Sequence, residues 1–345
     1  MKKWLLPLLC LVLMVVLSAC GAKSQEDVVG DLNKKMDDLT SYKTKAKMTL
    51  QMGTEPQEYN VEVWHNDPDF YRVELKNSQS DQSQMILRNK EGVFVLTPAL
   101  NKSFRFQSDW PKNSSQPYLY ESLVQDIMED PEATFKETEE HYVFETKTRY
   151  QNNKMLPMQE ITLSKEDLSP VTVKVMDTDR NPLVTVEFSD TEFNSKFDPD
   201  SFDMQRNMEG AQLDKETTAG VDEEKSQDEF AVMYSNDAAA KLIEEKMIDT
   251  ENGQRVVQIY EYQSAESTKR FTLIQETAEV MPAGAMVSTP VNGEPVDLGY
   301  TVGAMTETGI QWTHNGVEYM LASSELTPEE MISVAGSVQE GTMVK

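Results

Sequence analysis

The spacing of apolar residues changes along the chain, and each change marks an expected boundary. Near the start, apolar residues recur every three or four positions over residues 26–40, as on one face of a helix. From residue 43 to about 204 they alternate with polar residues, in short segments separated by Pro, Gly, Asn or Asp. Helical spacing returns at residues 118–128. The pattern predicts a large antiparallel sheet with a leading helix and an inserted helix.

The composition shifts after this region. Apolar residues become rare and acidic residues accumulate over residues 205–229, so we expect an acidic linker there. Residues 230–345 are expected to form a smaller α+β domain. Within it the pattern predicts a helix over 236–248, a hairpin at the Asn-Gly turn of 315–316, and a final helix that begins at the capping box of Thr327.

The first twenty residues have the layout of an export signal. Two lysines precede an apolar run of signal-peptide length, and small residues lead into Cys20. The run is shorter than a membrane-spanning helix needs to be. The layout predicts a signal peptide over residues 1–19, lipidation of Cys20 as in bacterial lipoproteins, and a tether over residues 20–25. A plain secreted protein cleaved at Ala19 or nearby is the alternative.

Net charge changes the expected mode of membrane attachment. The formal charge is −27, and such a surface is repelled by nucleic acid and by anionic headgroups. Nucleic-acid binding is therefore not expected. Each buried methylene contributes about 0.8 kcal/mol, and stable attachment usually takes two acyl chains. A diacylglyceryl anchor on Cys20 meets that need, so the expected location is the outer face of the cell membrane.

The sequence offers little catalytic chemistry. The histidines lie far apart, and His65 and His314 are expected to be surface residues at a strand end and in a hairpin turn. No nucleotide-binding loop or serine-nucleophile motif is found. The residues that begin at Asp177 have the spacing of a calcium loop, but Pro182 stands where that loop requires glycine. A glycosidase-like carboxylate pair is not singled out among 59 acidic residues. We expect no enzyme activity, cofactor or metal.

A candidate cavity follows from the alternation. Methionine is flexible and lines surfaces that accept varied apolar shapes, and the chain contains 20 of them. A curved sheet with apolar residues on its inner side can enclose a lipid-sized cavity. Ordinary core packing explains the same positions equally well. The candidate cavity residues are Met48, Leu50, Met52, Val61, Val63, Val93 and Val95.

The order of the elements resembles the LolA-like lipoprotein-carrier family, whose fold is shared by LolB and the RseB/MucB regulators. The residues that carry the resemblance are LTSYKTKA at 39–46, PDFYRVE at 68–74, KEGVFVLTP at 90–98 and DSF at 200–202. The resemblance covers residues 26–204. It implies an α+β fold, in which an antiparallel half-barrel sheet covered by helices is followed by the smaller α+β domain. It brings no catalytic residues to this sequence.

With its lipidation signal and its second domain, the whole chain resembles the YdcC-like sporulation lipoproteins of Firmicutes and, more distantly, the GerS germination lipoproteins. The resemblance implies a non-enzymatic interaction or licensing protein that acts at the envelope in sporulation and has an envelope protein as its partner. The alternative is a lipid- or lipoprotein-binding module that holds an acyl chain or lipopeptide in the half-barrel. A doubly acylated protein cannot shuttle between membranes, so an anchored receiver or sensor is expected rather than a carrier.

Overall fold

The structure is a computed structural model of the protein. It describes residues 23–51, 56–78, 83–108, 110–111, 114–150, 155–218, 233–235, 239–250, 253–264, 267–279, 288–291, 293–298 and 300–340. The predicted signal peptide, Cys20 and Met52 lie outside these residues. Within the described part of the chain, no helix is both long enough and apolar enough to cross a membrane.

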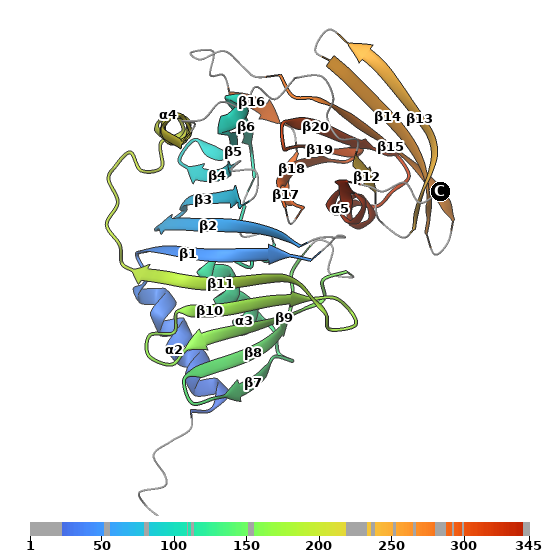
Figure 1. Ribbon diagram of the computed structural model, residues 1–345. Helices are drawn as coiled ribbons and strands as arrows, with labels where there is room; N and C mark the ends of the chain where they lie inside the picture. Colours follow the sequence, from blue (N-terminus) through green and yellow to red (C-terminus); the bar gives the residue numbers. More distant parts are fainter. Residues whose placement is uncertain are drawn as a thin grey trace, which may run out of the picture.

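Twelve strands of the described residues form one large open sheet (Figure 1). They are β1 Ser41–Leu50, β2 Gln57–Asn66, β3 Phe70–Asn77, β4 Ser83–Asn89, β5 Gly92–Thr97, β6 Lys102–Phe106, β7 Thr134–Glu137, β8 His141–Lys147, β9 Met158–Ser164, β10 Pro170–Met176, β11 Pro182–Phe193 and β16 Ser288–Val291. Their order is β16-β6-β5-β4-β3-β2-β1-β11-β10-β9-β8-β7. Neighbouring strands are antiparallel, except that β16 runs parallel to β6.

Alternation fixes the register of the first hairpin, as the sequence predicts. Met48 of β1 lies opposite Tyr59 of β2, and Ala46 lies opposite Val61. Residues that face each other in an antiparallel pair point to the same side of the sheet. Because the apolar residues of both strands fall on that side, a slip of one residue would expose all of them.

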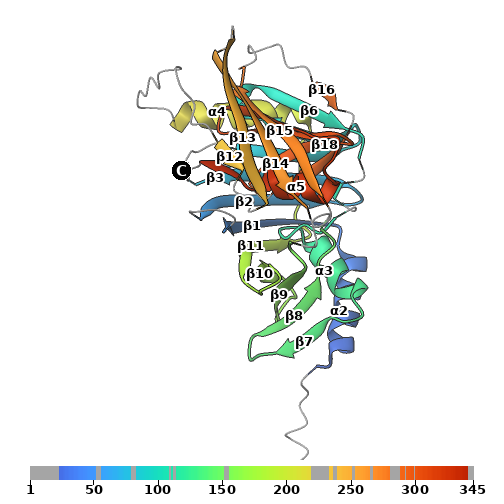
Figure 2. The ribbon, with the colours of Figure 1, turned by 90° about the vertical axis from the view of Figure 1, so that its right-hand side faces the viewer.

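Two helices cover one side of this sheet, here called the inner face. They are α2 (Gln25–Asp38) and α3 (Tyr120–Glu129), which confirm the predicted leading and inserted helices. Ser24 caps α2, because its side chain accepts a hydrogen bond from the backbone of Asp27. Figure 2 shows both helices on the same side of β7 to β11.

The predicted linker begins instead as an ordered helix, α4 (Met204–Thr218). Met208 is fully buried against the opposite side of the sheet, here called the outer face, and Arg72 Nε donates a hydrogen bond to Asn207 Oδ1 at 2.8 Å. The sparse apolar residues of this acidic segment dock onto an apolar patch that the sheet supplies, so the segment needs no core of its own. The patch and its cover consist of Met85, Leu87, Phe94, Leu96, Phe202 and Met208. Residues 219–229 of the predicted linker lie outside the described residues.

The C-terminal half forms a second sheet with a helix, α5 (Pro328–Gly336), which confirms the predicted last helix. The strands of this sheet are β13 Ala240–Thr250, β14 Gly253–Gln263, β15 Thr268–Thr277, β17 Glu294–Asp297, β18 Val302–Thr306, β19 Gly309–His314 and β20 Val317–Ala322. Their order is β13-β14-β15-β20-β19-β18-β17. A short pair, β12 (Met233–Ser235) and β21 (Val338–Glu340), lies apart from it. The α+β class and the antiparallel sheets agree with the sequence-based expectation.

The helix predicted over 236–248 is wrong. Residues 240–250 form strand β13, which pairs antiparallel with β14 over its whole length. Its alanine, lysine and glutamate residues favour a helix locally. Non-local pairing with the neighbouring strand outweighs that propensity, and a bulge between Leu242 and Glu244 accommodates the irregular apolar spacing.

The two halves of the chain are joined at the end of the larger sheet where β6 lies. Although β16 belongs to the C-terminal half in sequence, it extends the first sheet by pairing with β6. Ser103 Oγ and Ser288 Oγ form a hydrogen bond at 3.1 Å, and Lys102 forms an ion pair with Glu318. A strand from the predicted second domain, residues 230–345, therefore belongs to the sheet of the first domain.

Candidate functional site

The inner face gathers the residues that the sequence nominated for a ligand cavity. Six of these seven candidates are described; each is at most 3% exposed, and all belong to one hydrophobic core. Met52 lies outside the described residues. A role for these residues in binding a ligand stays a prediction. The six are Met48 and Leu50 of β1, Val61 and Val63 of β2, and Val93 and Val95 of β5.

Large side chains from α3 and the segment before it occupy the inner face. Trp110 packs edge-on against Tyr71 of β3 with ring centroids 5.9 Å apart, and Tyr120 packs against Tyr42 of β1 at 6.2 Å. Leu123 of α3 is fully buried in the same core. The inner face is thus covered by the protein itself over β1 to β3 and β7 to β11.

A buried carboxylate holds α3 in this position. Asp126 of α3 accepts hydrogen bonds from Ser115 Oγ at 2.8 Å and from Gln159 Nε2 at 2.6 Å. Its other oxygen pairs with Arg149 Nε at 2.5 Å. Burial raises the pKa of the Asp126 carboxyl, and Arg149 opposes that rise. Three donors from separate segments therefore converge on one helix and fix it against the sheet.

A second polar cluster joins the start of α3 to β1 and β2. His65 Nε2 lies 3.0 Å from Glu121 Oε1, and Tyr42 Oη donates a hydrogen bond to Glu121 Oε2 at 2.9 Å. The expectation of a surface position for His65 is wrong, because the residue is only 4% exposed. It lies at the end of β2, as expected, but α3 covers that end. Alternation alone does not reveal a helix that folds over a strand.

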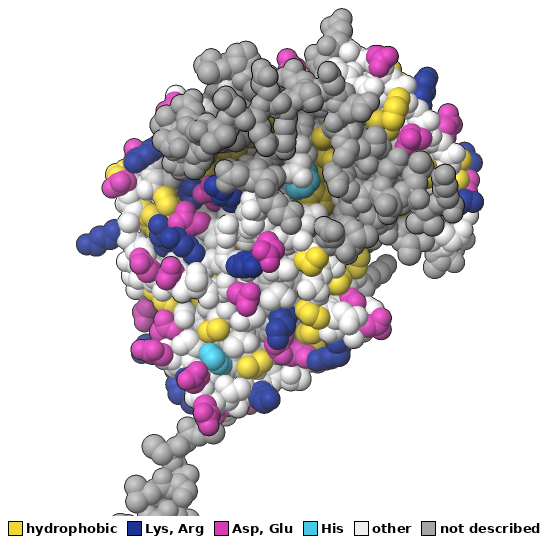
Figure 3. Space-filling model, viewed as in Figure 1, with side chains coloured by type: hydrophobic (Ala, Val, Ile, Leu, Met, Phe, Trp, Pro, Cys, Tyr) yellow, Lys and Arg dark blue, Asp and Glu magenta, His cyan; other side chains and the backbone are white. Residues whose placement is uncertain are grey.

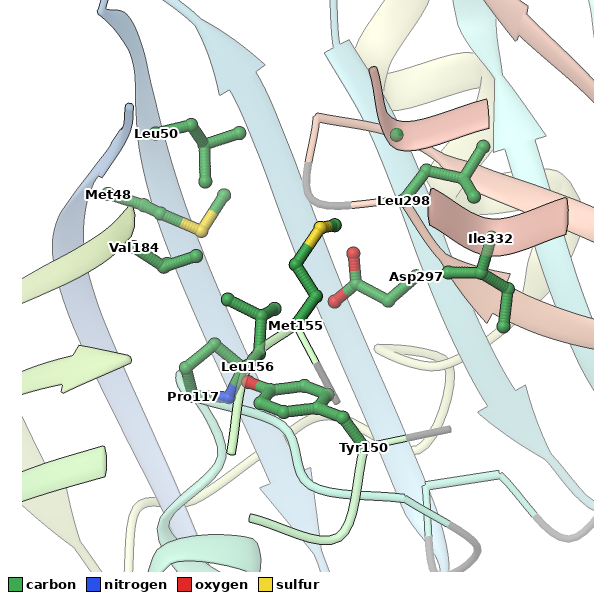
Figure 4. A pocket seen from close by; sticks show the side chains of 11 residues that line it. Met48, Leu50, Pro117, Tyr150, Met155, Leu156, Val184, Asp297, Leu298 and Ile332 are labelled. Atoms are coloured by element: carbon green, nitrogen blue, oxygen red, sulfur yellow. The ribbon is translucent and has the colours of Figure 1, made fainter. Parts of the chain in front are cut away.

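A small hollow lies at the seam between the two halves of the protein (Figure 4). Its free volume is about 30 Å³; counted with the solvent at its mouth it spans about 480 Å³. A buried water needs about 10–15 Å³, whereas small-molecule sites span about 300–1,000 Å³. The free volume of the hollow is therefore far below that of a site for an acyl chain. It is lined by Met48, Leu50, Pro117, Tyr150, Met155, Leu156, Val184, Asp297, Leu298, Ile332 and Gly336.

The polar groups at the seam were not among the site residues predicted from the sequence. Tyr118 Oη donates a hydrogen bond to Asp297 Oδ2 at 3.5 Å. Burial raises the pKa of Tyr118 and of Tyr150 well above the usual range, so both phenols stay neutral. Tyr150 and Asp297 lie in or beside loops, where no periodicity marks them, whereas Tyr118 lies at the start of the segment in which the apolar residues have helical spacing. Among the described residues, no group of three His, Cys, Asp or Glu side chains is arranged to hold a metal ion.

The surface lacks a large field of one sign on the face seen in Figure 3, where acidic and basic side chains are interspersed. Lys43 pairs with Glu62 at 3.2 Å, and Arg72 pairs with Glu62 at 3.0 Å and with Glu74 at 2.8 Å. Exposed ion pairs contribute about 0–1 kcal/mol each, whereas Arg72 is only 9% exposed, so its pairs are partly shielded from water.

Three solved structures with similar arrangements cover different shares of the chain. The complex of Pseudomonas aeruginosa MucA and MucB matches at 13% identity, covering 91% of this chain and 99% of that chain, with a TM-score of 0.31. A chain of the structure of the CwlD amidase from Clostridioides difficile in complex with the GerS lipoprotein matches at 17% identity, covering 52% of this chain and 98% of that chain, with a TM-score of 0.30. A LolA-superfamily protein from Nitrosomonas europaea matches at 12% identity over 52% and 98%, with a TM-score of 0.30.

Sequence comparison gives a much stronger relationship. The family model described as "Sporulation protein YdcC-like" matches residues 1–202. A Bacillus subtilis (strain 168) protein named "Sporulation protein YdcC" is 54% identical over 340 residues, which cover 98% of this chain and 97% of that protein. The chain therefore belongs to the sporulation protein YdcC-like family.

Proposed function

We propose that this protein is a non-enzymatic lipoprotein, anchored through Cys20 at the outer face of the cell membrane, that acts in sporulation by binding an envelope protein. The Bacillus subtilis relative is named a sporulation protein and matches nearly the whole chain, which supports the setting. The lipid anchor is supported by the layout of residues 1–20, a short charged and apolar signal that ends at a cysteine.

The observation that carries a protein-binding role over a lipid-carrying one is the occupied inner face. The six described cavity candidates belong to one core cluster with residues of α3, of the segment before it and of the C-terminal half. The hollow of Figure 4 has about 30 Å³ of free volume, and two others along the seam have about 40 and about 20 Å³. An acyl chain would have to displace buried side chains whose removal from the core costs several kcal/mol each. A protein partner can instead be bound on the outer surface without opening this core.

The anchor would keep that surface near the membrane. Helix α2 begins at Gln25, so only four residues lie between its start and Cys20, and the chain takes five residue steps from one to the other. A fully extended chain spans at most about 3.3–3.6 Å per residue, which limits the reach of this tether to about 17 Å. The folded part is therefore placed to meet proteins of the same membrane surface.

Acylation of Cys20 is the first part to test. The full chain and a Cys20→Ala variant are expressed in sporulating cells fed labelled palmitate, with Cys10→Ala as the matched control. We expect label and membrane fractionation for the unaltered chain and for Cys10→Ala, but not for Cys20→Ala, whose spore yield falls. A Cys20→Ala variant that stays labelled, or that supports sporulation at the normal level, contradicts the proposal.

The occupied interior is tested separately. The mature chain with Cys20→Ser is purified and examined by native mass spectrometry, with and without added palmitate. We expect the mass of the polypeptide alone under both conditions. A bound mass of lipid or lipopeptide size that is lost on denaturation contradicts the protein-binding role and favours the lipid-binding alternative.

A further inference from the structure

Strand β13 ends the C-terminal sheet. It pairs with β14 on one side, and among the described residues no strand pairs with its other side. Figure 1 shows it at the outer rim of the molecule. Such an edge presents a row of backbone donors and acceptors that templates pairing with another strand, and proteins usually protect it.

This edge is unusually apolar. Ile243, Met247 and Ile248 are 48%, 55% and 37% exposed, and they account for three of the five exposed large hydrophobic residues of the described chain. Exposed apolar side chains that gather on one strand mark an interaction surface more often than isolated ones do. The strand is also close to electrical balance, with two lysines and three acids, on a chain of net charge −27. Two copies of the chain would repel each other less here than elsewhere.

The pairing with β14 shows which side chains share a face. Glu245 lies opposite Gln258, whose Nε2 donates a hydrogen bond to Glu245 Oε2 at 2.9 Å, and Met247 lies opposite Val256. Gln258 and Val256 are both buried, and both lie on the same side of this seven-stranded sheet. Glu245 and Met247 therefore point to that side, and Lys246, which lies between them, points to the other.

We propose that β13 pairs antiparallel with β13 of a second copy of this chain, about a two-fold axis at Glu245, so that the two seven-stranded sheets become one. In this register Glu244 of each copy lies opposite Lys246 of the other, and Met247 of each copy approaches Ile243 of the other, at the bulge between Leu242 and Glu244. Opposite charges and apolar pairs directly across a strand pair are stabilising. The interface is isologous, as in most homodimers.

An axis at Ile243 would pair Lys241 with Glu245, but it falls on the bulge between Leu242 and Glu244; the other neighbouring registers pair no opposite charges within β13. An axis at Glu244 places that glutamate opposite itself, and an axis at Lys246 places two lysines together. An axis at Met247 places Glu245 opposite Asp249. The proposed register has one like-charge pair, Glu245 against Glu245 on the axis. This like-charge pair weakens the dimer. Its removal should therefore tighten a dimer in this register, but it would not tighten a nonspecific apolar contact.

The experiment is sedimentation equilibrium of the mature chain with Cys20→Ser, over a wide concentration range. We expect a monomer–dimer equilibrium. Glu244→Lys or Lys246→Glu alone weakens the dimer about tenfold, because each places like charges across both symmetric pairs. The double exchange restores the original affinity, and Glu245→Gln tightens the dimer. Thermal unfolding of each variant shows that it is folded.

Met320→Ser is the matched control, since Met320 is 46% exposed on β20 of the same sheet and away from this edge. It leaves the dimer unchanged, whereas Met247→Ser weakens it. A chain that stays monomeric at every concentration overturns the proposal. That result is expected if the edge pairs instead with an extended segment of a different protein. A double exchange that fails to restore the dimer also overturns it. The proposal does not rest on the partner-binding role or on the anchor.

Discussion

Gln84 of β4 and Val302 of β18 are joined by two hydrogen bonds across the seam between the two sheets. The backbone N–H of Val302 donates to Gln84 Oε1 at 2.8 Å, and Gln84 Nε2 donates to the Val302 carbonyl at 3.4 Å. Thr301 Oγ1 donates to the same Gln84 oxygen at 3.0 Å. The side-chain amide of Gln84 thus bonds the backbone N–H and C=O of Val302, as a neighbouring strand would. It joins the two halves of the protein, which β16 also connects.

Replacing Gln84 with alanine should loosen this seam. The substitution leaves the buried N–H of Val302 without its partner, which costs about 1–3 kcal/mol. Urea unfolding is expected to shift to lower denaturant, with the C-terminal half unfolding first. Gln311→Ala, an exposed glutamine of β19, is the control and should change stability by less than about 0.5 kcal/mol. Equal effects of the two variants would show that Gln84 does not join the halves.

Leu123→Ala should be strongly destabilising. Leu123 is fully buried where α3 covers the inner face, and truncation of a buried leucine costs about 2–5 kcal/mol. Met128→Ala on the same helix is the matched control, because Met128 is 44% exposed. Free energies of unfolding from urea titrations compare them. If both variants retain the original stability, α3 is not part of the core.

Met208→Ala tests whether α4 is docked or behaves as a linker. Met208 is fully buried against the outer face, so its truncation should cost about 2–4 kcal/mol if the helix is bound there. Limited proteolysis within α4 should also become faster. Gln205→Ala, at an exposed position of the helix, should alter neither measurement. Unchanged cleavage in the Met208 variant would mean that α4 is not held by this contact.

His314 should make the protein less stable in mild acid. Burial lowers the pKa of His314 to about 4 from 6.5. The unfolded chain therefore binds the proton more readily between these values, and stability falls as pH drops from 6.5 towards 4. The linkage gives a loss of at most about 2 kcal/mol between pH 7 and pH 5.

The measurement is the free energy of unfolding at both pH values for the original chain and for His314→Gln. The variant removes this titrating group, while the carboxylates of the chain are the same in both proteins. We expect the pH-dependent loss to be smaller in the variant. Parallel pH profiles for the two proteins would contradict the assignment.

Local patterns were sufficient for the elements that carry their own periodicity. The apolar stripe placed the first helix at 26–40, close to the observed Gln25–Asp38, and the capping box at Thr327 located the start of Pro328–Gly336. The alternation of β1 and β2 likewise placed Met48, Val61 and Val63 on one face. In each case the determining interactions lie within a few residues or between adjacent strands.

What the sequence by itself determined is the class of the fold and the inward side of the main strands; the export signal that ends at Cys20 stays a prediction. Tertiary structure alone decided that β13 is a strand, that α4 docks on the outer face and that β16 joins the first sheet. It also decided that α3 buries His65 and fills the inner face. These outcomes depend on surfaces supplied by residues far away in the chain, and free energy gained by burial or pairing there outweighs local propensity.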